Sequence, residues 1–256
     1  MKGKPLIRIG LIGHGKAGQA VASVLQQDPR FELAWVVRHS PVEAGATTSE
    51  GVPLIDMGTL LGSRWSDDRP VDGVVDFSTP SAIHSYAPLA RTHRWMVVSA
   101  ISAYQAHDLD LARDLGTTCR IMCSPNITLG INFMIMAARW LQEIAPFADI
   151  EILEQHFKEK PEVSGTAKKI AAHLDLPEEK ITSLRLGGIV GHHEVIFGFP
   201  YQTLRIVHDS IRREAFGTGA AFALGELALQ APGFYTFDEL LLQRIRGTLT
   251  VKATTH

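Results

Sequence analysis

The chain of 256 residues has only two cysteines, no excess of either charge and no long uninterrupted apolar run. Cys119 and Cys123 lie close together with no other cysteine to pair with, so the sequence predicts neither a disulfide framework nor a cysteine-based zinc site. We expect no resident metal. A net charge of −2 gives no general attraction to nucleic acid or to an anionic membrane. Glycine, proline or a charge interrupts each apolar stretch before membrane-spanning length, and we read no secretory signal. These absences favour a cytoplasmic enzyme.

Residues 1–125 alternate between short apolar runs and amphipathic stretches of helical spacing. The runs are Leu6–Ile12, Phe31–Val37, Val71–Phe77, Trp95–Ala100 and Thr118–Met122, and the helical stretches include Gly18–Gln27 and Ser81–Thr92. Such an alternation is typical of a parallel sheet covered by helices on both faces. We therefore expect residues 1–125 to form an α/β domain of the Rossmann type, a doubly wound parallel sheet.

After Asn126 the pattern changes to a mixture of helices and strands. Helices are predicted at Ile131–Ile144 and Thr166–Leu174, and strands at Asp149–His156, Thr182–Val190, Glu194–Phe197 and Thr203–Val207. This predicts a second α+β domain, residues 126–215, built on a mixed sheet. A helix rich in glycine and alanine follows at Arg212–Gln230, and we expect residues 216–256 to pack back on the first domain because small residues permit close approach.

The segment Gly13-His14-Gly15-Lys16-Ala17-Gly18 has the spacing of a dinucleotide-binding loop. It follows a predicted strand and precedes a predicted helix, which is the context that phosphate binding at a helix N-terminus requires. The Lys16 side chain could reach a phosphate. The alternative is a tight strand-to-helix turn without a ligand.

The end of the second predicted strand, Arg38-His39-Ser40, indicates which dinucleotide is bound. Proteins that prefer NAD place a carboxylate here to hold the ribose 2′-hydroxyl, whereas an arginine suits a 2′-phosphate. The sequence therefore predicts NADPH in preference to NADH. The alternative is that Arg38 is a solvated strand end.

Residues 151–170 hold the residues best suited to proton transfer. His156 can exchange a proton near neutral pH, Lys160 is a cation, and Ser164-Gly165-Thr166 opens a predicted helix whose first N–H groups attract anions. Together they suggest a site for a carboxylate-bearing substrate. A capped surface helix beside a solvated charge run, with His156 as a buried core histidine, would also produce this pattern.

Taken together, these motifs resemble the dihydrodipicolinate reductase family. The segment Val75–Pro80 is similar to its DF(S/T)xP turn, Ser124–Asn132 to its xPNxSxGxN crossing, and Glu154–Ala167 to its ExHHxxKxDxPSGTA signature. Further similarity lies in Arg185–His193, in the segment from His208 to Ala220, and in Gly233-Phe234-Tyr235. The matching motifs run along nearly the whole chain in the family's order.

The resemblance implies hydride transfer from a reduced nicotinamide to a cyclic imine dicarboxylate, with His156 as general acid. It implies that Lys160 is either a second proton-relay residue or a residue that contacts a substrate carboxylate. It implies a substrate site formed by Phe157, Lys160, Ser164, Gly165 and Thr166. It also implies a homotetramer assembled through the second domain's sheet. We expect the cofactor to contact Gly13, His14, Gly15, Lys16, Ala17, Gly18, Arg38, His39, Phe77, Ser78, Ser99, Ala100, Ile101, Asn126, Arg213 and Phe216.

The chain departs from the family pattern around the expected substrate. Ser99-Ala100-Ile101-Ser102 stands in place of the family's GTTG, and Phe157 replaces the second histidine of its doublet. Pro161-Glu162-Val163 is one residue short of the usual lead-in, and Gln202 stands where glutamate is usual. Three functions therefore remain open: the reductase of lysine and diaminopimelate biosynthesis, a reductase of another imine, and a dinucleotide-binding sensor or assembly factor without catalysis.

Overall fold

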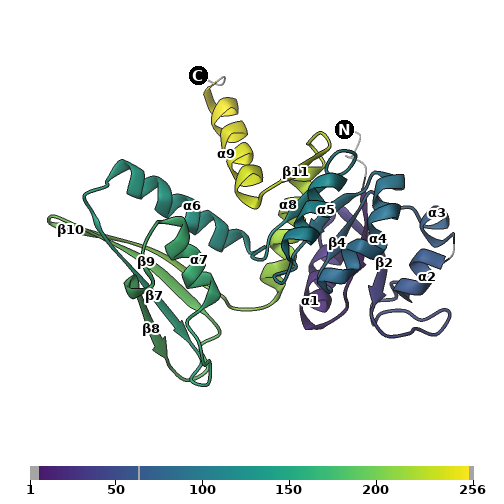
Figure 1. The fold of residues 1–256 in the computed structure, drawn as a ribbon, viewed down its shortest axis with the longest axis horizontal. Helices are drawn as coiled ribbons and strands as arrows, with labels where there is room; N and C mark the ends of the chain where they lie inside the picture. Colours follow the sequence, from purple (N-terminus) through teal and green to yellow (C-terminus); the bar gives the residue numbers. More distant parts are fainter. Residues whose placement is uncertain (1–5, 63, 254–256) are drawn as a thin grey trace. The chain divides into compact units, whose positions relative to one another are not determined.

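The structure, a computed structural model, describes residues 6–62 and 64–253. The chain divides into two compact units (Figure 1). The first contains Met1–Thr128 and Phe216–His256, and the second contains Leu129–Ala215. Among the described helices none is long and apolar enough to cross a membrane.

The first unit is built on a parallel sheet of seven strands in the order β11-β6-β5-β4-β1-β2-β3. The strands are β1 (Ile7–Ile12), β2 (Phe31–Arg38), β3 (Leu54–Asp56), β4 (Gly73–Asp76), β5 (Met96–Ser99), β6 (Arg120–Cys123) and β11 (Gly233–Tyr235). The helices that connect or follow them are α1 (Lys16–Gln27), α2 (Met57–Gly62), α3 (Trp65–Asp68), α4 (Pro80–His93), α5 (Ala106–Leu115), α8 (Glu214–Leu227) and α9 (Phe237–Ala253). The chain reverses its winding between β1 and β4, which is the point where doubly wound sheets bind ligands. The predicted Rossmann-type fold is confirmed.

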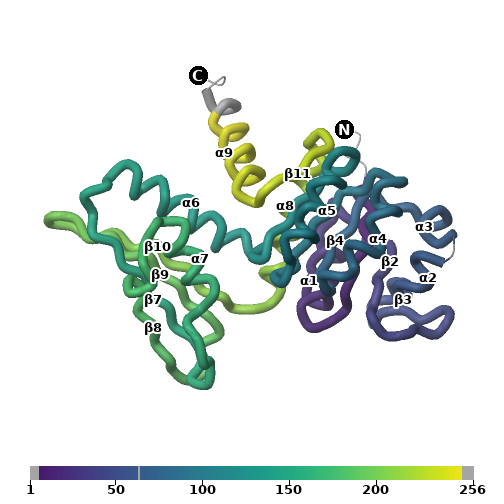
Figure 2. Tube along the Cα trace, viewed as in Figure 1, coloured from purple at the N-terminus to yellow at the C-terminus, as the bar shows by residue number. Residues whose placement is uncertain are grey.

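The C-terminal segment completes this unit. β11 adds to the sheet beside β6 and also contacts α5 (Figure 2). α8 comes close to the rest of the unit because of two of its three glycines: a Cβ atom at Gly217 would lie 2.5 Å from Val24, and one at Gly219 would lie 1.7 Å from the Ile127 carbonyl oxygen. Any larger residue at these two positions would force the helix outward.

The second unit is a four-stranded mixed sheet in the order β10-β9-β7-β8, covered by helices on one face (Figure 1). Its strands are β7 (Asp149–His156), β8 (Ile181–Arg185), β9 (His192–Phe199) and β10 (Gln202–Asp209), and its helices are α6 (Leu129–Ile144), α7 (Gly165–His173) and the 3-10 turn η1 (Glu178–Lys180). Only β7 and β8 are parallel; the other pairs are antiparallel. Apolar residues of α6 and α7 pack on Ile150, Ile152, Val195 and Phe197 to form its core.

The strand predicted at Thr182–Val190 ends early, at Arg185. The chain turns at Gly187, whose φ of 48° is favourable for glycine, and the Leu186 amide bonds to the carbonyl of His156. β3 and β11 have three residues each, too few for a periodic pattern to be recognised from the sequence.

Candidate active site

A pocket of about 670 Å³ lies in the first unit at the carboxyl ends of β1, β2 and β4. The loop after β1 forms its floor, and its glycines are required by geometry. Gly13 has a φ of 100°, and a Cβ atom there would lie 2.6 Å from the backbone of Phe77. A Cβ atom at Gly18 would lie 2.0 Å from the Gly13 carbonyl oxygen. α1 begins directly after Gly15, and no side chain caps its N-terminus. This combination leaves N–H groups that favour an anion.

Seven of the residues expected to bind the cofactor line this pocket: Gly13, His14, Gly15, Arg38, His39, Phe77 and Ser78. Burial lowers the pKa of His14, so its imidazole is neutral at physiological pH. Three others, Lys16, Ala17 and Gly18, belong to the first turn of α1 behind the loop and are not part of the lining.

Arg38 ends β2 at the rim of the pocket and is exposed. Its neighbour across the sheet is Asp56, whose carboxylate accepts the amides of Val42 at 3.3 Å and Thr59 at 2.7 Å. No carboxylate forms an ion pair with Arg38 within the described part of the chain. The guanidinium is therefore free to bind an anion from the pocket.

Asp76 holds the turn that forms one wall of the pocket. This fully buried carboxylate accepts the amide of Ser78 at 2.9 Å and its hydroxyl at 2.5 Å, and it also accepts the Tyr86 hydroxyl at 3.0 Å. Burial raises its pKa to about 6, against the effect of these hydrogen bonds. The sequence analysis includes Asp76 in the Val75–Pro80 motif but assigns it no role. Its position at the end of a buried strand, directly before the turn, is the signal that could have indicated that it holds this turn.

A smaller hollow of about 170 Å³ adjoins Phe77 and Ser78 and is lined by Ala100 and Ile101. Ser99 does not reach it: the side chain is fully buried, and its hydroxyl donates to Tyr104 at 2.9 Å. The expected cofactor contact through Ser99 is therefore restricted to its backbone, because the hydroxyl is already used inside the protein.

The remaining expected cofactor contacts fall in different places. Phe216 packs on Phe77 with ring centroids 6.1 Å apart, and Asn126 accepts the amide of Thr128 at 3.2 Å. Arg213 is exposed and belongs to the second unit.

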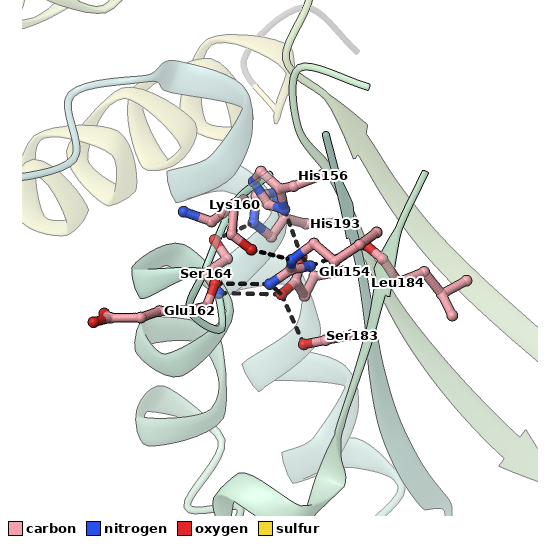
Figure 3. Close-up of polar contacts among 9 residues, drawn as sticks. Glu154, His156, Lys160, Glu162, Ser164, Ser183, Leu184 and His193 are labelled. Atoms are coloured by element: carbon pink, nitrogen blue, oxygen red, sulfur yellow. Dashed lines mark hydrogen bonds and ion pairs between the residues drawn. The ribbon is translucent and has the colours of Figure 1, made fainter. Parts of the chain in front are cut away.

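In the second unit a buried carboxylate organises the residues around His156 (Figure 3). Glu154 bonds to Nδ1 of His156 at 2.5 Å and to the Arg185 guanidinium at 2.9 and 3.0 Å. It also accepts the Ser183 hydroxyl at 2.7 Å and the Ser164 amide at 3.1 Å. Burial alone would raise the pKa of Glu154, but these hydrogen bonds lower it to about 2. Glu154 is therefore an anion that fixes the orientation of the imidazole.

The other ring nitrogen of His156 points toward Gly191. A Cβ atom at Gly191 would lie 3.2 Å from Nε2, so the glycine leaves this nitrogen accessible. The His193 ring meets His156 edge-on with centroids 5.3 Å apart, and Nε2 of His193 bonds to the Ser164 hydroxyl at 2.8 Å. Burial, with a further effect from the charge of His156, lowers the pKa of His193 to about 4. His193 is thus neutral and buried, and its Nδ1 has no partner among the described residues.

The predicted anion cradle at α7 is only partly available. The amide and the hydroxyl of Ser164 are both engaged, by Glu154 and His193, so the expectation that Ser164 offers a free N–H group is wrong. For the amides of Gly165 and Thr166, in contrast, the described residues supply no hydrogen-bond acceptor. Two N–H groups of the first turn of α7 therefore remain for a ligand.

Lys160 and Phe157 lie in the loop that leads from β7 to α7. The Lys160 carbonyl accepts Nε of Arg185 at 3.0 Å, and its amide donates to the Phe157 carbonyl at 3.1 Å. Within residues 6–62 and 64–253, the Lys160 amine takes part in no ion pair. The Phe157 side chain is 41% exposed. The loop's backbone is thus anchored by Arg185, whereas these two side chains are free to contact a ligand.

Comparison with known proteins agrees with this arrangement. Residues 7–127 match the family described as dihydrodipicolinate reductase, N-terminus, and residues 126–241 match dihydrodipicolinate reductase, C-terminus. The 4-hydroxy-tetrahydrodipicolinate reductase of Caldanaerobacter subterraneus subsp. tengcongensis is 31% identical over 92% of this chain and 98% of its own. That of Thermosipho africanus is 29% identical over the same shares.

A solved structure supports the fold as well. Dipicolinate-bound dihydrodipicolinate reductase from Paenisporosarcina sp. TG-14 has a TM-score of 0.74 at 22% identity, over 91% of this chain and 98% of that chain. The two matching family descriptions cover both units, and the relatives align with this chain over nearly their own full lengths. The chain belongs to the dihydrodipicolinate reductase family.

Proposed function

We propose that this protein is an NADPH-dependent 4-hydroxy-tetrahydrodipicolinate reductase of lysine and diaminopimelate biosynthesis. Family membership and the names of its relatives support the substrate class. The observation that carries the proposal is the buried Glu154–His156 pair, beside a lysine and a helix N-terminus with two available amides. A proton donor, a cation and an anion cradle are what the reduction of a dicarboxylate imine requires.

The pocket of the first unit fits a dinucleotide. Because Gly13 and Gly18 have no side chain, the loop stays compact and leaves room for a pyrophosphate against the α1 N-terminus. Arg38 offers its guanidinium to a 2′-phosphate. When bound, the reduced nicotinamide supplies the hydride that adds to the unsaturated ring. We assign the expected contacts at Gly13, His14, Gly15, Arg38, His39, Phe77 and Ser78 to the cofactor, with Ala100 and Ile101 beside them.

His156 is assigned as the general acid. Hydride addition leaves an electron pair on the substrate, and Nε2 of His156 delivers the proton that completes the reduction. Glu154 holds Nδ1 and balances the positive charge of the imidazolium before transfer. Arg185 and Ser183 keep Glu154 in place, so they act through it and need not touch the substrate.

Lys160, Gly165 and Thr166 are assigned to the substrate carboxylates. A carboxylate accepting two N–H groups at a helix N-terminus and facing a lysine is stabilised by hydrogen bonds and by charge. Ser164 supports this cradle from behind, through its bonds to Glu154 and His193. The exposed ring of Phe157 forms part of the substrate site as an apolar contact.

The proposal is tested by NADPH oxidation with 4-hydroxy-tetrahydrodipicolinate as substrate. His156→Ala should lower kcat by about a hundredfold or more, the usual scale for losing a general acid. His93→Ala, a histidine of α4 outside both sites, serves as control and should leave turnover unchanged. A wild-type protein that binds NADPH but does not oxidise it with this substrate would contradict the proposal.

A second candidate is reduction of a different cyclic imine by the same residues. It is favoured by Phe157, which stands in place of a family histidine and is 41% exposed, since this ring makes the surroundings of Lys160 more apolar. A panel of imines with fewer carboxylates, measured beside the first substrate, separates the two. Turnover of a panel member without turnover of the dicarboxylate would select the second candidate.

We also propose that the second unit assembles the protein into a homotetramer through the sheet face opposite α6 and α7. The strand pairing places Leu153, Leu184, Ile196 and Val207 on that face. Leu184 and Val207 are 39% and 50% exposed, and no helix of this unit covers them. Apolar side chains gathered on an uncovered sheet support an interface between copies of the chain.

A further inference from the structure

Three side chains of the first unit that can bind a metal lie close together and are not part of the lining of the dinucleotide pocket: His84 of α4 and His107 and Asp108 of α5. Nε2 of His84 lies 2.6 Å from Oδ1 of Asp108, and Nε2 of His107 lies 3.2 Å from the same oxygen. All three ligand atoms are within 4.8 Å of one another. None of them takes part in the chemistry proposed above.

The carboxylate of Asp108 is held for this arrangement. Its side chain is only 3% exposed, and Oδ2 accepts the backbone amide of Gln105 at 2.8 Å as part of the capping box that begins α5. Fixing of one oxygen leaves the other directed at both imidazoles, which is how supporting hydrogen bonds orient metal ligands.

We propose that His84, His107 and Asp108 bind a Zn²⁺ ion. Two imidazoles and one carboxylate are an established ligand set for zinc. Ligands of one tetrahedral zinc lie about 3.3 Å apart, because each is about 2.1 Å from the metal. The His107–Asp108 separation already has this value, and His84 needs to withdraw by less than about 1 Å. The metal replaces the N–H proton through which Nε2 of His84 otherwise bonds to Oδ1.

The exposure of the ligands fixes the character of the site. The side chains of His84 and His107 are 45% and 72% exposed, so the fourth position is open to water and the ion exchanges with solvent. Ligation joins α4 to α5, which follow β4 and β5 respectively. Zinc therefore stabilises the folded first unit, since a ligand that binds the native state raises its unfolding temperature.

The test is titration of the full-length protein, first freed of metal with a chelator, with ZnCl₂ in a calorimeter. The wild type should bind one zinc ion, and both His84→Gln and His107→Gln should weaken binding at least about tenfold. The matched control is His93→Gln, because His93 also lies on α4 beside a carboxylate, Asp67 at 3.7 Å, but has no third ligand among the described residues. It should bind zinc like the wild type.

Two further readouts keep the result independent of folding and of enzymatic activity. Zinc should raise the Tm of the wild type and of His93→Gln but not of His84→Gln, and Co²⁺ should give visible absorption bands only in the first two. Equal zinc affinity in the wild type and both histidine variants would overturn the proposal. It would also be overturned if His192→Gln, which alters a second histidine–carboxylate cluster at Glu194 and Asp209, abolished binding instead.

Discussion

Glu154 is a carboxylate with no exposed side-chain surface that remains ionised, because Arg185, Ser183, His156 and the Ser164 amide all donate to it. Its pKa of about 2 lies below the ordinary value of 4.5. A carboxylate with a lowered pKa in the folded state stabilises the protein at any pH above its unfolded value. This contribution is lost progressively as the pH falls from about 4.5 to about 2.

Glu154→Gln should therefore destabilise the protein at neutral pH by roughly 3–5 kcal/mol, since Arg185 is left without its anion. The difference from the wild type in urea unfolding should be fully present above about pH 4.5 and should shrink as the pH falls from about 4.5 to about 2. Glu151→Gln on the same strand is the control, because Glu151 is 40% exposed and its contacts with Lys180 and the Thr182 hydroxyl are both long, at 3.5 Å. A difference that stays constant down to about pH 3 would show that the charge of Glu154 is not what stabilises the unit.

Arg38 determines the choice of cofactor if its guanidinium binds the 2′-phosphate. Arg38→Asp should lower the ratio of kcat/KM for NADPH to that for NADH by roughly ten- to hundredfold, because a charged hydrogen bond is lost and repulsion replaces it. Arg64→Asp changes the same charge at an exposed position outside the pocket and should leave the ratio unaltered. An unchanged ratio in Arg38→Asp would place the phosphate elsewhere.

At the scale of elements, the sequence predicted the strands and helices that have a periodic pattern. It did not predict the contacts that depend on how a loop folds back against them. The alternation in Asp149–His156 predicts that strand and puts Glu154 and His156 on one face, so their pairing was within reach. The capture of the Ser164 amide by Glu154 was not, because it depends on how residues 157–163 return to the sheet. The proposed zinc ligands His84 and Asp108 are 24 residues apart on two helices, and no sequence spacing indicates that they meet.

Gly219 of α8 gives a test of packing in this element. A Cβ atom would meet the carbonyl oxygen of Ile127 at 1.7 Å, and a backbone atom cannot rotate away. Gly219→Ala should destabilise the protein by about 1–3 kcal/mol despite the better helix propensity of alanine. In α9, Gly247 has nothing within 4 Å of a Cβ atom, so Gly247→Ala should stabilise by about 0.5–1 kcal/mol. Thermal unfolding should thus show Tm shifts of opposite sign; shifts of the same sign would show that α8 adjusts freely.

For the whole molecule, the uncovered face of the second unit's sheet is the feature that a single chain leaves unexplained. On this face Glu194 of β9 lies between two apolar residues, Val207 of β10 and Leu153 of β7. Glu194 also forms an ion pair with Arg205 of β10, so the face combines apolar side chains with a charged pair. A face of this mixed kind is typical of an interface between copies, in which charged pairs fix the register and apolar contacts stabilise it.

Val207→Asp should dissociate this assembly, because four copies of an unpaired carboxylate would be buried in a tetramer. Light scattering after gel filtration should give the wild type a mass of about four 28.0 kDa chains and the variant a smaller one. Leu229→Asp is the matched control: Leu229 is 66% exposed but belongs to the first unit, so its assembly should be that of the wild type. A wild type of single-chain mass, or a variant that remains assembled, would show that the open sheet face is not the interface. The activity of the dissociated variant then decides whether the Glu154–His156 pair works within one chain, since neither residue lies on the exposed face.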